Sequence, residues 1–238
     1  MRICSVTLKD YQGAANLSVA KLKSHLLRSL DAYLTPLEFH RVSDRFYGDR
    51  YCRDDARVRL CVHVSTRARD EALEAELPYI SVRFNAVEDM VASLEESHPL
   101  TTPAGIAARA TLTVPTSSWG GFFRKTWVIR SQDDLANITD QIATYAMEKG
   151  LPVFETLSNP EQALRVLAAD DETARSYAGP EDVRAKKAVA LAFLVHGQEA
   201  AKQIGIEKSA RLTGEGLSTF TLWMERLLRS FSAATPQR

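Results

Sequence analysis

The residues that most readily suggest chemistry are arginines interleaved with aromatic side chains in the segment 43–59, SDRFYGDRYCRDDARVR. Arginine and tyrosine are enriched at the centres of protein interfaces, and arginines among aromatic rings also suit the stacking and charge of single-stranded nucleic acid. Four aspartates in the same stretch offset much of the positive charge. The segment therefore predicts a solvated hairpin first, a protein-binding edge second and a nucleic-acid site third.

A second candidate surface is the segment 117–131, SSWGGFFRKTWVIRS. The glycine pair permits a tight turn, and the residues after it alternate as in a strand. Trp127 is predicted to lie in the core, because tryptophan is usually largely buried. Trp119 precedes the glycines and is the better candidate for an exposed contact residue.

The predicted contact residues come from these two segments and from an acidic stretch near residue 170. All would serve a protein partner. They are Arg45, Tyr47, Arg50, Trp119, Arg124, Asp170 and Asp171.

Motifs for metal or cofactor binding do not occur in the sequence. The five histidines are scattered, without HExxH, HxH or HxxxH spacing, and GGFFRKT lacks the spacing of a phosphate-binding loop. We expect no metal and no cofactor. His196 precedes Gly197 at a predicted helix end, where the helix dipole explains a histidine.

The sequence also shows no clear pair of side chains that could act together in catalysis. Cys61 and His63 share a strand face without pointing at each other, and there is no GxSxG motif. The acidic pairs at 54–55, 133–134 and 170–172 have local roles as turns or helix starts. We predict no catalytic residue. The alternative is a hydrolase or transferase whose site assembles only in space, with the arginines holding a phosphorylated ligand.

Charge constrains the partner. The formal net charge is zero, so duplex nucleic acid is not the expected partner. Residues 131–182 carry eleven acidic and three basic side chains, and residues 183–238 carry nine basic and four acidic. This asymmetry gives either a dipolar face that steers a partner or simply solvated helices of different charge, and the second reading is favoured.

The cysteines and the apolar runs indicate the cellular compartment in which the protein is expected. The three cysteines, Cys4, Cys52 and Cys61, show no CxxC or paired spacing, so reduced thiols are expected. No stretch approaches the roughly 20 apolar residues of a membrane span, and the first residues show no signal-peptide pattern. We therefore expect a cytoplasmic protein with no membrane contact.

The apolar spacing predicts helices and strands in two blocks. A helix is expected within 16–36, alternating strands within 57–64 and 79–86, a helix within 87–98, and two further strands before residue 131. Beyond residue 131 the pattern is helical. Ser131 with Asp134 resembles a capping box, Gly150 is predicted to end a helix, and Asn159 with Pro160 to begin one.

The fold class that follows is α+β. About five mainly antiparallel strands in the N-terminal half pack with helices, because short turns rather than helical crossovers join most strands, and a helical half follows. No linker or repeat divides the chain, so residues 1–238 are predicted to form a single domain. The alternative is a separate helical subdomain over 151–238.

The segment 127–167 carries a family resemblance. A tryptophan strand and capped helix in WVIRSQDDL are followed by GLPVFETLSNPEQAL. This layout resembles small uncharacterised bacterial α+β domains, some of which are immunity proteins of polymorphic toxin systems. The resemblance implies an intracellular, non-catalytic protein that binds another protein. An immunity protein of this kind would neutralise a toxin by covering the toxin's active site. The remaining alternative is a regulatory subunit that docks through its C-terminal amphipathic helix.

Overall fold

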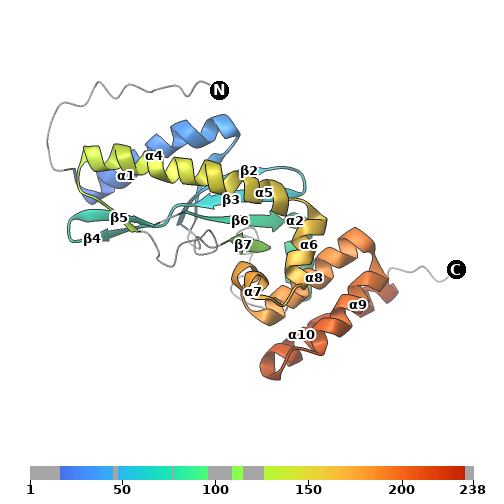
Figure 1. The fold of residues 1–238 in the computed structure, drawn as a ribbon. Coiled ribbons are helices and arrows are strands. Elements are labelled where there is room, and N and C mark those ends of the chain that lie inside the picture. Colours follow the sequence, from blue (N-terminus) through green and yellow to red (C-terminus); the bar gives the residue numbers. More distant parts are fainter. Residues whose placement is uncertain (1–16, 45–47, 77, 96–108, 115–125, 234–238) are drawn as a thin grey trace.

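The computed structural model describes residues 17–44, 48–76, 78–95, 109–114 and 126–233 (Figure 1). Four of the predicted contact residues lie outside these ranges. They are Arg45, Tyr47, Trp119 and Arg124. Their roles stay predictions.

The strands form two antiparallel sheets. The five-stranded sheet has the order β1-β2-β3-β6-β7, and the three-stranded sheet has the order β4-β5-β8. The bounds are β1 His40–Asp44, β2 Gly48–Asp54, β3 Val58–His63, β4 Thr66–Arg69, β5 Ala72–Glu76, β6 Tyr79–Phe84, β7 Leu112–Val114 and β8 Thr126–Ile129. Every pairing is antiparallel, which confirms the predicted sheet type.

One face of the larger sheet is apolar and packs under helices. Alternate residues of β3 and β6, among them Leu60, Val62, Ile80 and Val82, are buried. Helices α1 (Val19–Leu34) and α4 (Gln132–Tyr145) lie together above the sheets (Figure 1). The alternation in the sequence predicted this face, because successive side chains of a strand point to opposite sides.

The apolar spacing of helix α1 predicts one buried face, and the sequence offers Asn16 or Ser18 as its cap. The Ser18 side chain accepts a hydrogen bond from the Lys21 backbone and caps the first turn. The buried stripe is leucine throughout: Leu22, Leu26, Leu27, Leu30 and Leu34. The Tyr51 hydroxyl donates to the Leu27 carbonyl at 2.5 Å and joins the helix to β2.

Helix α4 starts with the predicted capping box, in which Ser131 and Asp134 satisfy each other's backbone amides. The predicted helix end at Gly150 is wrong. The chain continues through a π-helical turn, Ala146–Gly150, into α5, Leu151–Leu157, and Gly150 keeps a right-handed φ of −72°. A Cβ at this position would lie 3.4 Å from the Ile80 side chain, at the limit of ordinary van der Waals contact, so the chain passes close to β6 here.

The remaining helices form a layer at one end of the sheet (Figure 1). They are α6 Pro160–Ala168, α7 Glu172–Ala178, α8 Glu181–His196, α9 Gln198–Ser209 and α10 Gly214–Ala233. Asn159 caps α6 as predicted. Helix α8 is central and packs against α2 (Asn85–Leu94), α6, α7, α9 and α10.

One burial prediction in α8 is wrong. The apolar spacing after Gly179 and Pro180 predicts that Val183, Leu191 and Leu194 point inward, but 44% of the surface of Leu194 is exposed. Residues 184–192 are buried on all sides, because neighbouring helices surround this part of α8. A helix packed all round shows no single apolar stripe from which to read its orientation.

Hydrogen bonds tie the C-terminal helix to α2. The indole Nε1 of Trp223 donates to the Val91 carbonyl at 3.3 Å, and the Arg226 guanidinium donates to the Leu94 carbonyl at 2.9 Å. Phe220 and Trp223 are buried. The aromatic face of α10 is therefore turned into the molecule. The α+β class, with a helical C-terminal half, is confirmed.

Within the described ranges, no helix combines the length and the apolar character that crossing a bilayer requires.

Candidate functional site

A cavity of about 820 Å³ lies between the edge of the larger sheet and the helical layer. Its walls come from α2, from residues 109–113 around β7, and from α7, α8 and α10. A volume of this size is in the range of ligand sites, which run from roughly 300 to 1,000 Å³. Among the described residues, the cavity is a concave feature from which a binding role can be argued.

One side of the cavity is apolar. Its lining includes Val91 and Leu94 from α2, Tyr177 from α7, and Leu222 and Trp223 from α10. Trp223 is buried, whereas 51% of the surface of Leu222 is exposed. The apolar wall thus reaches from the interior to the surface at α10.

A buried ion pair belongs to the lining of the same cavity. Glu88 of α2 has no exposed surface, and its Oε1 atom lies 3.5 Å from Nζ of Lys187 on α8. The Lys187 ammonium also donates to the Ala110 carbonyl at 2.5 Å. Helix α8 is thereby joined to both α2 and the residues that precede β7.

A second group of charges is centred on Glu95. Its Oε2 accepts from Nη1 of Arg109 at 2.7 Å, and its Oε1 lies 3.7 Å from Nζ of Lys186. The same ammonium lies 3.5 Å from Asp182, one turn earlier in α8. All four side chains line the cavity. The charges of the lining are therefore largely paired with one another.

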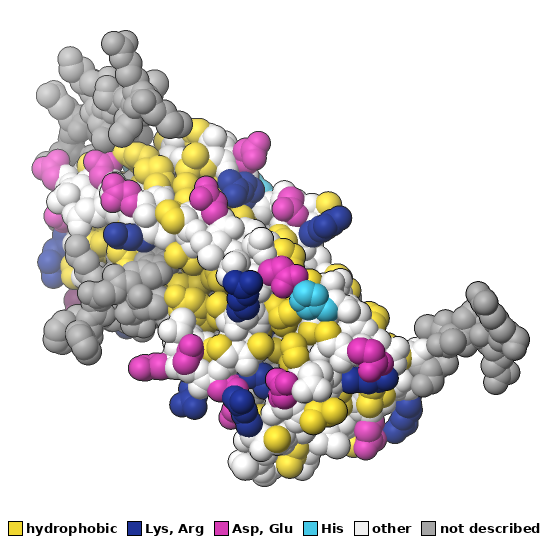
Figure 2. Space-filling model, turned by 45° about the vertical axis from the view of Figure 1, so that its right-hand side comes forward, with side chains coloured by type: hydrophobic (Ala, Val, Ile, Leu, Met, Phe, Trp, Pro, Cys, Tyr) yellow, Lys and Arg dark blue, Asp and Glu magenta, His cyan; other side chains and the backbone are white. Residues whose placement is uncertain are grey.

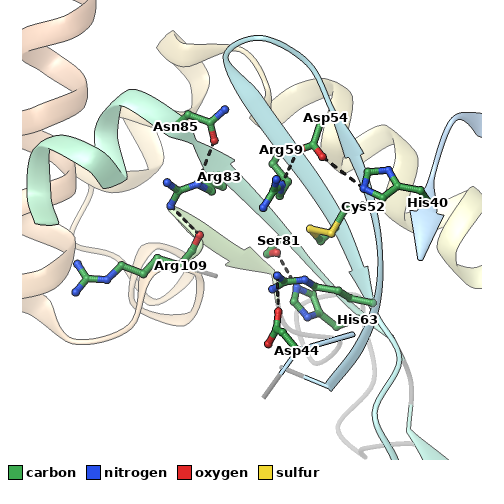
Figure 3. The surroundings of a disulfide bond; sticks show 12 residues. His40, Asp44, Cys52, Asp54, Arg59, His63, Ser81, Arg83, Asn85 and Arg109 are labelled. Atoms are coloured by element: carbon green, nitrogen blue, oxygen red, sulfur yellow. Dashed lines mark hydrogen bonds and ion pairs between the residues drawn. A yellow bond between two sulfur atoms is a disulfide. The ribbon is translucent and has the colours of Figure 1, made fainter. Parts of the chain in front are cut away.

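Arg83 connects the cavity to the polar face of the five-stranded sheet (Figure 3). Its guanidinium donates to Asn85 at 3.1 Å, to Asp89 at 2.8 Å and to the Arg109 carbonyl at 3.3 Å. Burial lowers the pKa of Arg83, and the carboxylates of Glu88 and Asp89 act in the opposite direction. The side chain of Arg109 extends from this point toward the helices (Figure 3).

The polar face carries a histidine–serine pair. Nε2 of His63 lies 2.7 Å from Oγ of Ser81, and the Tyr79 ring stacks on the imidazole at 4.2 Å between centroids. Burial, followed by the positive charge of Arg50, lowers the pKa of His63 to about 3, although Asp44 acts in the opposite direction. The imidazole is therefore neutral near neutral pH.

This pair has the contact distance of a nucleophile and its base, but its environment suits a structural role better. A general base works best when its pKa lies near the working pH. A pKa of about 3 makes His63 a weak acceptor for a serine proton. Ser81 and His63 are also both buried.

The expectation of reduced cysteines is wrong for two of them. Cys52 on β2 and Cys61 on β3 are directly paired in the sheet and form a disulfide, with a Cα–Cα distance of 4.2 Å (Figure 3). Cys61 is buried and is bonded to the neighbouring strand β2. Cys4 lies outside the described residues. The spacing of nine residues gave no signal, because only the hairpin register places the two thiols opposite each other.

The predicted contact residues that the structure describes all have partners within the chain. Arg50 is buried, and its guanidinium lies 2.6 Å from Asp44. Asp171 caps α7 by accepting from the Ala174 amide at 2.8 Å. Asp171 adjoins Asp170 at the start of α7, whereas Arg50 is buried in β2 and adds almost no exposed surface.

Asp170 is the centre of a cation cluster. Its Oδ1 accepts from Arg184 at 2.9 Å and from Lys208 at 2.7 Å, and its Oδ2 is paired with Arg211. Arg184 is 1% exposed. The carboxylate therefore compensates a buried guanidinium.

The charge asymmetry of the sequence is partly cancelled by folding. Within the acidic stretch 131–182, Asp170, Glu181 and Asp182 face arginines or lysines that follow them in the chain. Figure 2 shows acidic and basic side chains interspersed with apolar ones on the face that it presents. The surface shown is mixed rather than of a single sign.

Sequence reasoning missed Glu88 and Lys187. A signal for Lys187 exists in the sequence. Two adjacent lysines, at 186 and 187, come directly before the apolar run AVALAFLV in a predicted helix. Charged side chains are rarely buried unless they are paired. The partner in α2 had no comparable signal, since Glu88 follows Val87 in an ordinary amphipathic pattern.

Neither a metal centre nor a known relative defines the site further. In the parts of the chain that the structure describes, no three His, Cys, Asp or Glu side chains are grouped so as to hold a metal ion. Comparison with family models, curated proteins and solved structures gave no match. The fold and cavity define an α+β protein with a mixed apolar and ion-paired cavity between a sheet edge and a helical layer.

Proposed function

We propose that this chain is a protein-binding module and that the cavity receives an anchoring side chain or short segment of the partner. The observation that carries the proposal is the apolar wall that extends from buried Trp223 to exposed Leu222. Binding energy at protein interfaces is concentrated in a few anchors that fill desolvated pockets. A wall of this kind offers such a pocket with a rim on the surface.

The paired charges support the same function. Glu95, Arg109, Lys186 and Asp182 neutralise one another within the lining. Their positions are fixed by contacts inside the chain, so a partner would meet a preformed surface. Preorganisation reduces the entropy that association costs.

The experiment compares two leucines on the helical layer. Leu222 lines the cavity and is 51% exposed, whereas Leu194 is 44% exposed and does not line it. A partner is first captured with the tagged chain and identified, and its affinity is then measured with purified components. We expect Leu222→Arg to weaken binding by at least about thirtyfold, the effect of losing an interface anchor.

The Leu194→Arg variant serves as the matched control and is expected to bind within about twofold of the wild type, as a residue outside the anchor pocket does. Equal affinities for both variants would show that the cavity is not the docking site. Circular dichroism of each variant confirms that the helices are retained.

The volume of the cavity favours a second candidate function, the binding or turnover of a small amphipathic molecule. Under this alternative the enzyme expected from residues converging in space would use the ionisable groups of the lining. A metabolite that raises the melting temperature of the isolated chain, and that is consumed on incubation, would favour it over a protein partner.

The proposal also specifies the kind of partner. The resemblance to immunity domains implies a bacterial toxin, bound in the cytoplasm so that its active site is covered. Co-expression of a candidate toxin with the wild-type chain and with the Leu222→Arg variant tests this form. Protection by the wild type alone would support it.

A further inference from the structure

The lining of the cavity presents more cations than reachable carboxylates. Among the described residues, its acidic side chains are Glu88, Glu95 and Asp182, and its basic ones are Arg109, Lys186, Lys187 and Arg226. Glu88 is fully buried with both oxygens closed off, and its charge is shared between Lys187 and Arg83, which lies outside the lining. A molecule in the cavity therefore meets two carboxylates and an excess of positive charge.

Ion pairing within the chain does not use up the hydrogen-bond donors of these cations. A guanidinium has five N–H donors and a lysine ammonium has three. The Arg109 guanidinium donates one hydrogen bond, from Nη1 to Glu95 at 2.7 Å. The Lys186 ammonium lies 3.7 Å from Glu95 and 3.5 Å from Asp182, and within the described part of the chain it makes no hydrogen bond.

The donors that remain are open to the cavity. Among the described residues, the buried side-chain nitrogens that lack a hydrogen bond include none from Arg109 or Lys186. The unused N–H groups of these two residues are therefore within reach of solvent. The Arg109 side chain extends from the sheet toward the helices that wall the cavity (Figure 3).

A carboxylate matches this arrangement of donors. Hydrogen bonds from arginine or lysine to a carboxylate are charge-assisted, and the fork of a guanidinium fits the two carboxylate oxygens. A cationic ligand would face four basic side chains, and the two carboxylates within its reach are already next to Arg109 and Lys186. Leu94 precedes Glu95 in α2 and belongs to the apolar wall, so apolar and cationic parts of the lining adjoin.

We infer that the cavity binds a small carboxylic acid with an apolar stem, whose carboxylate accepts hydrogen bonds from Arg109 and Lys186. The stem would contact Leu94, Leu222 and Trp223. This inference rests on the cavity as the binding site of the proposed function, and it names a ligand class for the second candidate there, a small amphipathic molecule. The volume of about 820 Å³ accommodates such an acid, since ligand sites run from roughly 300 to 1,000 Å³.

Three probes of the same chain length test the preference for the head group. Octanoate is an anion, octan-1-ol is neutral and octylammonium is a cation. Each is titrated into the full chain at neutral pH, and binding is followed by calorimetry and by ligand-detected NMR. We expect octanoate to bind at least about tenfold more tightly than the other two probes, because charge-assisted hydrogen bonds are roughly twice as strong as neutral ones.

Two variants locate the carboxylate. Arg109→Gln and Lys186→Gln each remove a charged donor, so octanoate affinity should fall about tenfold in either variant. Octan-1-ol affinity should stay within about twofold, because the apolar wall is unchanged. The alcohol therefore separates the loss of a carboxylate contact from a general change in the shape of the cavity.

Arg229→Gln is the matched control. Arg229 is an exposed arginine of α10 that does not line the cavity and pairs with Glu225. Its replacement should leave octanoate affinity within about twofold, because solvent and salt screen an exposed charge.

Several outcomes would overturn the inference. They are binding of octan-1-ol or octylammonium as tight as that of octanoate, unchanged octanoate binding in Arg109→Gln, a parallel loss of octanoate and octan-1-ol in both variants, and no saturable binding of octanoate.

The titration involves no partner protein, so its outcome is separate from that of the docking function. If octanoate fails while Leu222→Arg still weakens the partner, only the carboxylate chemistry is wrong. If octanoate binds as expected while Leu222→Arg and Leu194→Arg bind the partner equally, the docking function is wrong and the acid site stands.

Discussion

The imidazole Nε2 of His63 lies 2.7 Å from the hydroxyl oxygen of Ser81, across the pairing of β3 with β6, and both side chains are buried. The contact holds a neutral histidine in the sheet, because burial and the charge of Arg50 lower its pKa to about 3. In the unfolded chain the same side chain would titrate near 6.5. Folding and protonation of His63 therefore oppose each other.

The first prediction concerns acid stability. Between pH 6.5 and pH 3 the unfolded chain takes up a proton at His63 that the folded chain does not. The stabilisation is complete above pH 6.5 and is lost as the pH falls. From about pH 7 to about pH 5, the wild type should lose about 2 kcal/mol more unfolding free energy than His63→Gln. Urea unfolding at both pH values measures the difference.

Gln203→Ala is the control for this titration, because it replaces an exposed side chain of α9 that does not titrate. Its pH profile should follow the wild type closely. A wild-type profile parallel to that of His63→Gln would contradict the assignment of the effect to His63.

The second prediction concerns the disulfide between Cys52 and Cys61. Closing a loop of this length restricts the unfolded chain, and its loss should lower the unfolding free energy by about 2–3 kcal/mol. Denaturant unfolding with and without reductant measures this change. The double variant Cys52→Ala/Cys61→Ala should show no response to reductant, and a wild type equally insensitive would indicate that the bond is not formed.

The third prediction separates structure from binding at Asp170. Replacing it by asparagine removes the nearest countercharge of the buried Arg184 and leaves Glu181, at 3.7 Å, as its acidic partner, so the unfolding free energy should fall by about 3 kcal/mol. Asp133→Asn, in the exposed first turn of α4, should change it by less than about 0.5 kcal/mol. A stable Asp170→Asn variant that has lost its partner would instead support the predicted contact role.

The fourth prediction tests the start of α4. Ser131→Ala removes the side chain that caps the Asp134 amide at 3.1 Å and should reduce stability by about 1 kcal/mol. Ser131→Asp retains an acceptor at the cap and should restore most of this loss. Thermal unfolding of both variants is the measurement, and an unchanged Ser131→Ala would show that the cap contributes little.

Local sequence signals predicted the parts of the fold that depend on neighbouring residues. The Ser18 cap, the Ser131–Asp134 box and the Asn159 cap each depend on residues a few positions apart. The alternation in β3 likewise marked Leu60 and Val62 as core. These features are fixed by backbone geometry, which repeats every two residues in a strand and about every 3.6 in a helix.

The candidate site was not predictable in the same way. Glu88 and Lys187 are nearly a hundred positions apart, and only the packing of α8 on α2 brings them together. The disulfide was missed because the register of β2 on β3 is a property of the folded hairpin. The prediction of a helix end at Gly150 was wrong because a glycine in the sequence is compatible both with a helix end and with a helix that passes close to a sheet.

The hydrogen bonds of Trp223 to Val91 and of Arg226 to Leu94 each join residues 132 positions apart. A ribosome makes α2 long before α10, and proteins generally begin to fold during synthesis. The wall formed by α10 is thus added late, and the cavity lacks that side until then. A nascent chain stalled before residue 214 is expected to have its sheet but no closed binding site, so recognition of any ligand in the cavity would begin only after α10 has been made.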